Sequence, residues 1–279
     1  MKNTTRPSEK YTQQTFQEVE NWIKEIGINF NNSRFGSAKK VWDHWHQTLE
    51  VPSHEELWSL CEFADLIELY HYFSKEKLDP AIVKRVISGC DLLADESDTT
   101  ARNYQFEWKV SSRLKRAGFT IVENLNHDVV VEFEGYKLYI ECKRVKNYKK
   151  MNERIKYAYE KQLASVNNRS QHGAIFLDLS RIVYLNFINS TKQPHTDMKK
   201  LNEWRNSFDS ELKAMLEKHH SNILNDVKIF VIYYTFPVFI KDDGIYKLIK
   251  FNHFLNLTHD DEPQTKKILE LIRNSVGNA

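Results

Sequence analysis

The stretch from Asp128 to Lys143, DVVVEFEGYKLYIECK, constrains the fold of this chain more than any other segment. It reads as two short strands joined at Glu134-Gly135, because glycine tolerates the positive φ angles of a two-residue hairpin turn. Side chains alternate between the two faces of a strand. We therefore expect the carboxylates of Asp128 and Glu141 and the ammonium of Lys143 to converge above a strand pair whose other face is almost wholly apolar.

This trio has no role in an ordinary buried sheet face, where charged groups are costly to desolvate. A site that holds a divalent cation and activates a water needs these groups. The hairpin therefore predicts a site for a divalent cation.

Length and composition indicate a globular protein with its own hydrophobic core. With 279 residues, 41% hydrophobic and 28% charged, the chain can bury a sizeable core as one large domain or two modest ones. The formal net charge of +2 provides no global attraction for nucleic acid, so any basic surface must be local. The amino terminus lacks the apolar core of a secretory signal, and the apolar run Ile229–Ile240 is too short to cross a bilayer. We expect a cytoplasmic protein without membrane contact.

Cysteine usage agrees with that compartment. The three cysteines, Cys61, Cys90 and Cys142, are widely spaced and odd in number. This pattern fits reduced thiols better than a framework of disulfides.

Residues 1–96 are expected to form a helical accessory subdomain. Apolar residues recur at helical spacing in four segments, and Asp79-Pro80 is a typical helix start. The polar stretch 95–100 is the best candidate boundary. The four helical segments are Phe16–Ile26, Val41–Trp45, Leu57–Ile67 and Ile82–Leu92.

Residues 97–279 alternate between helical and strand patterns. A helix over 101–117 precedes a strand over 119–122 and the hairpin, and further helices are expected over 150–167, 195–219 and 263–275. Apolar strands are expected over 174–179 and 227–236, with a hairpin turn at 242–244. This order predicts an α/β sandwich with a mixed sheet.

The charged residues resemble a known family. Glu107 on a helix, Asp128 on a strand and Glu141-Cys142-Lys143 on the next strand are similar to the PD-(D/E)xK nuclease superfamily, which includes restriction endonucleases and Holliday-junction resolvases. The resemblance covers residues 101–180 and extends to 255 at most. The Glu-x-Lys tripeptide alone is frequent in any sequence, so the specificity comes from the combination. One departure is His127, which stands where the family often has proline.

The resemblance implies a fold and a chemistry. The fold would be a restriction endonuclease-like mixed central sheet flanked by helices, preceded by an all-α amino-terminal subdomain. Asp128, Glu141 and the Cys142 carbonyl would bind Mg²⁺, which Mn²⁺ can replace, and Glu107 would complete the site. Lys143 would orient the attacking water and stabilise the transition state. The implied activity is hydrolysis of DNA, in defence, restriction or repair.

A basic segment follows the hairpin. Residues 143–161 include eight lysines and arginines but only two glutamates, and three tyrosines are interleaved with them. Such a patch suits a phosphate backbone, with tyrosine available for stacking on bases. Gln162 resembles a polar residue that many family members carry on the helix after the Glu-x-Lys strand. The predicted nucleic-acid contacts are Arg144, Lys146, Lys149, Lys150, Arg154 and Gln162.

Other interpretations stay open at this point. Glu141 and Lys143 could be an ordinary exposed pair, Glu107 a surface residue, and the basic segment a solvated helix face. The chain could keep the nuclease fold and bind nucleic acid or protein without cleavage, or it could act on RNA. A homodimer and the choice between endonuclease and exonuclease are also open. The histidines complete no zinc pattern, and no P-loop, GxSxG or GxGxxG motif is present.

Overall fold

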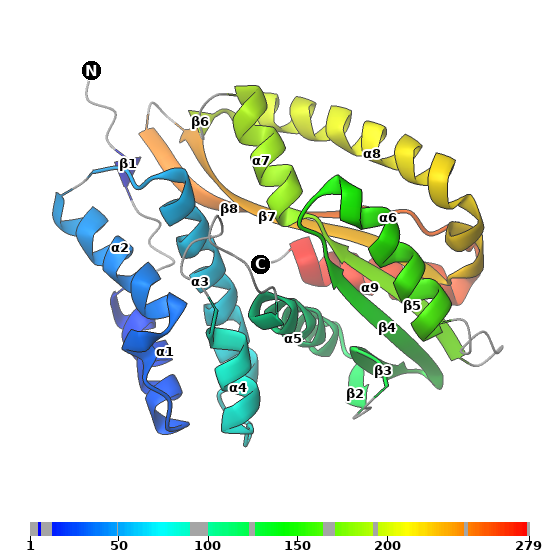
Figure 1. The fold of residues 1–279 in the computed structure, drawn as a ribbon, viewed down its shortest axis with the longest axis horizontal. Helices are drawn as coiled ribbons and strands as arrows, with labels where there is room; N and C mark the ends of the chain where they lie inside the picture. Colours follow the sequence, from blue (N-terminus) through cyan, green and yellow to red (C-terminus); the bar gives the residue numbers. More distant parts are fainter. Residues whose placement is uncertain are drawn as a thin grey trace. The chain divides into compact units, whose positions relative to one another are not determined.

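The computed structural model is a mixed α/β fold with a mixed sheet, flanking helices and a helical amino-terminal part (Figure 1). It describes residues 5–6, 13–48, 50–89, 100–122, 126–163, 171–191, 195–242 and 245–277. Side chains are not described at residues 5–6, 161–162, 171–172, 242, 245–246 and 276–277.

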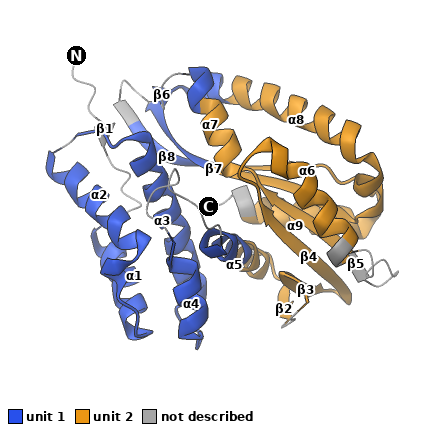
Figure 2. Cartoon of the chain, in the orientation of Figure 1, with its two compact units in different colours: residues 1–109, 188–201, 236–251 blue, residues 110–187, 202–235, 252–279 orange. Residues whose placement is uncertain are grey.

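The chain forms two compact units, shown in Figure 2. Unit 1 comprises residues 1–109, 188–201 and 236–251, and unit 2 comprises 110–187, 202–235 and 252–279. The boundary expected at residue 96 lies among residues 90–99, which are outside the described part. The first division between the two compact units falls within a helix, between Lys109 and Val110, and each unit takes further segments from the second half of the chain.

Unit 1 contains the expected amino-terminal helices. Ser53 and Glu56 form a capping box at the start of the third helix, because each side chain accepts a hydrogen bond from the other residue's backbone N–H. Asp79 caps the fourth helix, with Pro80 at its first position as predicted. The elements are β1 (Thr5–Arg6), α1 (Gln13–Glu25), η1 (Phe30–Asn32), α2 (Arg34–Thr48), α3 (His54–Phe73), α4 (Pro80–Ile87) and β6 (His195–Thr196).

The core of unit 1 is rich in aromatic rings. Phe16 of α1 stacks on Phe63 of α3 with ring centroids 4.2 Å apart. Trp42 and Trp45 of α2 meet edge to face, and both are buried, as the helical pattern predicts. Because each large ring removes much apolar surface from water, these helices are stabilised mainly by packing with one another.

Buried charges run along α3 in unit 1 and form what we call the α3 charge network. Glu62 binds the guanidinium groups of Arg34 and Arg102, at 2.6 Å each. Asp65 binds the ammonium groups of Lys109, at 2.6 Å, and of Lys250. Burial alone would raise the pKa of Asp65, but the two lysines outweigh it and hold the pKa well below its ordinary value.

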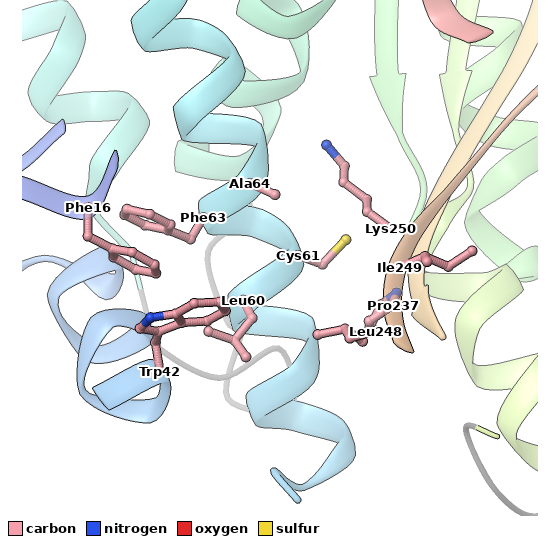
Figure 3. Close-up of a pocket in the computed structure, with 10 residues that line it drawn as sticks. All are labelled: Phe16, Trp42, Leu60, Cys61, Phe63, Ala64, Pro237, Leu248, Ile249 and Lys250. Atoms are coloured by element: carbon pink, nitrogen blue, oxygen red, sulfur yellow. The ribbon is translucent and has the colours of Figure 1, made fainter. Parts of the chain in front are cut away.

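A small cavity of about 30 Å³ lies in unit 1 beside this network. Figure 3 shows Cys61, Ala64 and Lys250 at its wall, together with rings such as Phe16 and Trp42. This volume holds about one water molecule, so the cavity is too small for a substrate. Cys61 and Cys142 are both free thiols, in agreement with the expectation, whereas Cys90 lies outside the described residues.

Unit 2 carries the predicted hairpin and most of the sheet. Three helices and two long strands contribute residues to both units: α5 (Thr100–Arg116), α7 (Ser180–Thr191), α8 (Met198–Asp226), β7 (Ile229–Asp242) and β8 (Ile245–Asn256). The remaining elements of unit 2 are β2 (Thr120–Val122), β3 (Val129–Phe133), β4 (Tyr136–Arg144), α6 (Tyr148–Tyr157), η2 (Ala158–Leu163), β5 (Gln171–Asp178) and α9 (Pro263–Gly277). In Figure 1, α6 is drawn in front of β4 and β5.

The sheet has the order β1-β8-β7-β5-β4-β3-β2, with β6 paired to β7. β4, β5 and β7 are mutually parallel, whereas β2, β3 and β4 are antiparallel. The sheet is therefore mixed, as predicted, and β4 lies between an antiparallel and a parallel neighbour.

The hairpin turn adopts the predicted two-residue form. Glu134 and Gly135 both have positive φ, 49° and 80°, as a type I′ turn requires. The strands pair Phe133 with Tyr136 next to the turn, and the register continues to Val129 opposite Ile140. The turn thus fixes which residues of β3 and β4 face each other.

Several elements differ from the sequence predictions. The segment Ser180–Thr191 forms the helix α7, which we did not predict, because its apolar residues do not form a single stripe. The helix expected over 150–167 is an α-helix only to Tyr157 and continues as the π-helix η2. The helix expected over 195–219 extends to Asp226, with a kink at His220. None of the described helices combines the length and apolar character needed to cross a membrane.

Candidate metal-binding site

The hairpin register brings the predicted charged residues of unit 2 together. Asp128 directly precedes β3, and the pairing of Val129 with Ile140 places Asp128 opposite Glu141 on β4. Opposed residues of an antiparallel pair share a face of the sheet, and Lys143, two residues beyond Glu141, shares that face too. The three side chains therefore meet on one side of the hairpin, as their alternation in the sequence indicates.

Lys143 bridges the two carboxylates. Its Nζ donates hydrogen bonds to Asp128 Oδ2 at 2.7 Å and to Glu141 Oε2 at 2.8 Å. Asp128 Oδ2 also accepts the backbone N–H of Cys142 at 2.8 Å. This backbone contact ties Asp128 to β4, so its carboxylate has a fixed position relative to Glu141.

The site is largely removed from solvent. The side chain of Glu141 has no exposed surface, and those of Lys143 and Asp128 are 12% and 25% exposed. Burial raises the pKa of Glu141 above its ordinary value, and the Asp128 carboxylate raises it further, against the opposing effect of Lys143 and His127. Burial would lower the pKa of Lys143, but the carboxylates of Asp128 and Glu141 outweigh it and raise that pKa above its ordinary value.

His127 also contacts the site, which the sequence did not indicate. Its Nδ1 lies 3.0 Å from Glu141 Oε1, and its side chain is 10% exposed. The ring packs edge to face against Tyr139, with centroids 4.9 Å apart. Strict alternation from Asp128 would place His127 on the opposite face. The residues before β3 form a bend instead of a strand, and this lets His127 reach Glu141.

The donor set fits a hard divalent cation. Two carboxylates and one ammonium leave one net negative charge in a buried place, and a cation would offset that charge. Within the described residues, no group of three or more His, Cys, Asp and Glu side chains is arranged to hold a metal ion. Magnesium commonly takes only one or two carboxylates and fills its other positions with water and phosphate, so the pair of Asp128 and Glu141 suffices.

Two further predicted members are placed as follows. The side chain of Cys142 is buried and its sulfur is a free thiol, so the residue contributes only backbone groups to the site face. Glu107 is half-buried on α5 and belongs to unit 1. Its part in the site stays a prediction.

The basic segment after β4 is mostly on the surface of unit 2. Lys149, Lys150 and Arg154 are exposed on α6, and Lys146 is half-buried before it. Lys150 pairs with Glu153 at 2.7 Å, an exposed pair that leaves both groups accessible to solvent. Arg144 differs from this group, because its side chain is only 5% exposed and its Nε lies 3.5 Å from Asp178. Gln162 lies in η2, and its side chain is outside the described part.

Comparisons of the chain with families of known proteins, with characterised proteins and with solved structures yield no match. A functional assignment for this chain therefore rests on its own residues and their geometry.

Proposed function

We propose that this protein is a metal-dependent nuclease that hydrolyses phosphodiester bonds of DNA, with a PD-(D/E)xK-type site on a restriction endonuclease-like fold. The observation that carries the proposal is the bridge from Lys143 to Asp128 and Glu141 across the β3–β4 hairpin. Two carboxylates and a lysine on one face of two paired strands are the groups that this chemistry requires.

Each residue has a distinct part in the proposed reaction. Asp128 and Glu141 would hold Mg²⁺ or Mn²⁺, joined by the Cys142 carbonyl. When bound, the ion supplies Lewis-acid chemistry, since it polarises water and offsets the negative charge that develops on phosphate. Lys143 would orient the attacking water and stabilise the negative charge of the transition state as a hydrogen-bond donor.

The exposed cations of α6 would contact the substrate backbone. Lys149, Lys150 and Arg154 lie on the helix that begins four residues after β4 ends. Tyr148 and Tyr157, at 42% and 49% exposure, are the exposed aromatic rings of the same helix. Cations contribute affinity through phosphate contacts, and exposed aromatic rings are suited to stacking on bases.

The test is cleavage of plasmid DNA with Mg²⁺, with EDTA added in a parallel reaction. We expect the wild-type protein to cleave, and we expect EDTA and the substitution Lys143→Ala each to abolish cleavage. Lys137→Ala is the matched control, because Lys137 lies on the same strand and face and pairs with Glu132 at 3.2 Å. Cleavage by the Lys143→Ala protein at the wild-type rate would refute the assigned site.

The main alternative is a module that keeps this fold and binds nucleic acid or protein without cleaving it. One observation favours this alternative. The ammonium of Lys143 already pairs with the carboxylates of Asp128 and Glu141, so these side chains are neutralised in part without a metal ion. Plasmid, linear and single-stranded DNA together with RNA would be tested in parallel. Inactivity on all of them, with binding retained, would establish the binding module, and cleavage of RNA alone would redirect the assignment to a ribonuclease.

A further inference from the structure

The side chain of His127 contacts the candidate site but has no role in the proposed reaction. Its Nδ1 faces Glu141 Oε1 at 3.0 Å, while Lys143 Nζ faces the other oxygen, Oε2, at 2.8 Å. Glu141 is therefore held at both oxygens, from two different parts of the chain. A completely buried carboxylate with two donors has a defined plane as well as a defined position.

The two donors differ in what a cation would do to them. The Lys143 ammonium lies within 2.8 Å of both carboxylates, so it stands where a cation shared by Asp128 and Glu141 would bind. A cation bound there would compete with the ammonium for Oε2 of Glu141. His127 contacts the opposite oxygen, Oε1, so its hydrogen bond would persist whichever cation were bound.

Tyr139 fixes the imidazole in turn. The rings of His127 and Tyr139 pack edge to face at 4.9 Å, and the His127 side chain is 10% exposed. Such packing leaves the imidazole little rotational freedom, so the contact to Glu141 is built into the hairpin. When Glu141 is ionised it can only accept, and the Nδ1 atom must then carry the proton of this hydrogen bond.

We propose that His127 is a positioning residue, whose Nδ1–H holds Oε1 of Glu141 so that Oε2 is directed at the cation shared with Asp128. This inference rests on the proposed function, because it assigns His127 a part in binding the same cation. Groups that orient a ligating carboxylate contribute about 10- to 100-fold to metal affinity. His127 would contribute through Glu141 and would touch neither the metal nor the substrate.

Two substitutions separate the hydrogen bond from the packing. His127→Phe keeps a ring against Tyr139 and removes the donor. His127→Asn removes the ring, but its amide nitrogen is nearly isosteric with Nδ1 and can donate to the same oxygen. Both proteins are tested as the full chain, and their urea unfolding is measured first to show that each is folded.

The measurement is Mn²⁺ binding by isothermal titration calorimetry, since Mn²⁺ accepts the same oxygen ligands as Mg²⁺. We expect His127→Phe to raise the dissociation constant for Mn²⁺ by about 10- to 100-fold. His127→Asn should retain most of the affinity, which a purely structural role of the ring would not allow. Wild-type affinity in the Phe protein, or equal losses in both folded variants, would overturn the positioning role.

The same titration distinguishes failure of the proposed function from failure of this inference. A wild-type protein that binds Mn²⁺ with the predicted order of affinities, yet cleaves no nucleic acid, removes the nuclease assignment and leaves the role of His127 standing. A wild-type protein that cleaves DNA while His127→Phe binds Mn²⁺ normally removes only the role of His127. Absence of Mn²⁺ binding in the wild type overturns both.

Discussion

The α3 charge network of unit 1 leads to a strong prediction about stability. Asp65 is buried on α3, and one of its oxygens, Oδ1, binds the ammonium groups of both Lys109 and Lys250. Those two side chains are 4% and 10% exposed. The substitution Asp65→Asn keeps the volume and one acceptor oxygen but removes the charge. It would deprive both buried ammonium groups of this carboxylate, while the carboxylate of Glu68 remains 4.0 Å from Lys250 Nζ.

The cost follows from burial and proximity. Breaking a buried ion pair by removing one partner costs about 3–5 kcal/mol, since the remaining charge stays desolvated. The amide oxygen of asparagine recovers part of this by accepting one hydrogen bond. We therefore expect Asp65→Asn to lower the free energy of unfolding by about 3 kcal/mol.

Urea unfolding followed by tryptophan fluorescence measures this change in the relevant unit, because Trp22, Trp42, Trp45, Trp58 and Trp108 lie in unit 1 and Trp204 alone in unit 2. Asp43→Asn is the matched control. Asp43 pairs with Lys39 at 2.7 Å on α2, but its side chain is 33% exposed. Such a surface pair contributes about 0.3–0.5 kcal/mol.

Measuring the free energy of unfolding at low pH gives a second test. The folded pKa of Asp65 lies below its ordinary value of 3.8, so its contribution is complete above that pH. The contribution is lost as the pH falls through the folded pKa, so the difference between wild type and Asp65→Asn should shrink in strong acid. A loss at neutral pH no larger than that of Asp43→Asn would refute the reasoning.

Three further predictions concern unit 2. The substitution Lys143→Met should abolish cleavage. Calorimetry should show that the variant binds Mn²⁺ at least as tightly as the wild type, because no ammonium competes for the two carboxylates. Weaker Mn²⁺ binding would contradict this competition. Lys149→Ala with Arg154→Ala should reduce affinity for DNA and lower its log–log salt slope by about two. Lys213→Ala on α8, which is exposed, serves as its control and should change neither. Gly135→Ala should lower the free energy of unfolding by about 1 kcal/mol, since φ is 80° there, and an unchanged urea midpoint would argue against that strain.

The sequence predicted what depends on short-range rules. The turn at Glu134-Gly135 and the convergence of Asp128, Glu141 and Lys143 follow from turn chemistry and strand alternation over sixteen consecutive residues. The amino-terminal helices follow from apolar spacing and caps within single segments. These features need no knowledge of how distant parts of the chain meet.

The sequence did not predict what depends on local exceptions and long-range contacts. His127 reaches Glu141 because the chain bends before β3, and alternation alone excludes that contact. The α3 charge network joins residues far apart in the chain, since Lys250 meets Asp65 across 185 positions. The helix α7 lacks a clear apolar stripe, so periodicity gave no signal for it. The division into units crosses α5, α7, α8, β7 and β8, whose patterns are continuous through the boundary.

The interleaving of the two units determines how this protein can be dissected. The chain passes from one unit to the other at five places, and two of these fall inside β7 and β8. A truncated fragment that contained the β3–β4 hairpin would end in severed strands with unpaired backbone groups. Unit 2 is therefore not a portable module, and its properties have to be altered by point substitution in the intact polypeptide.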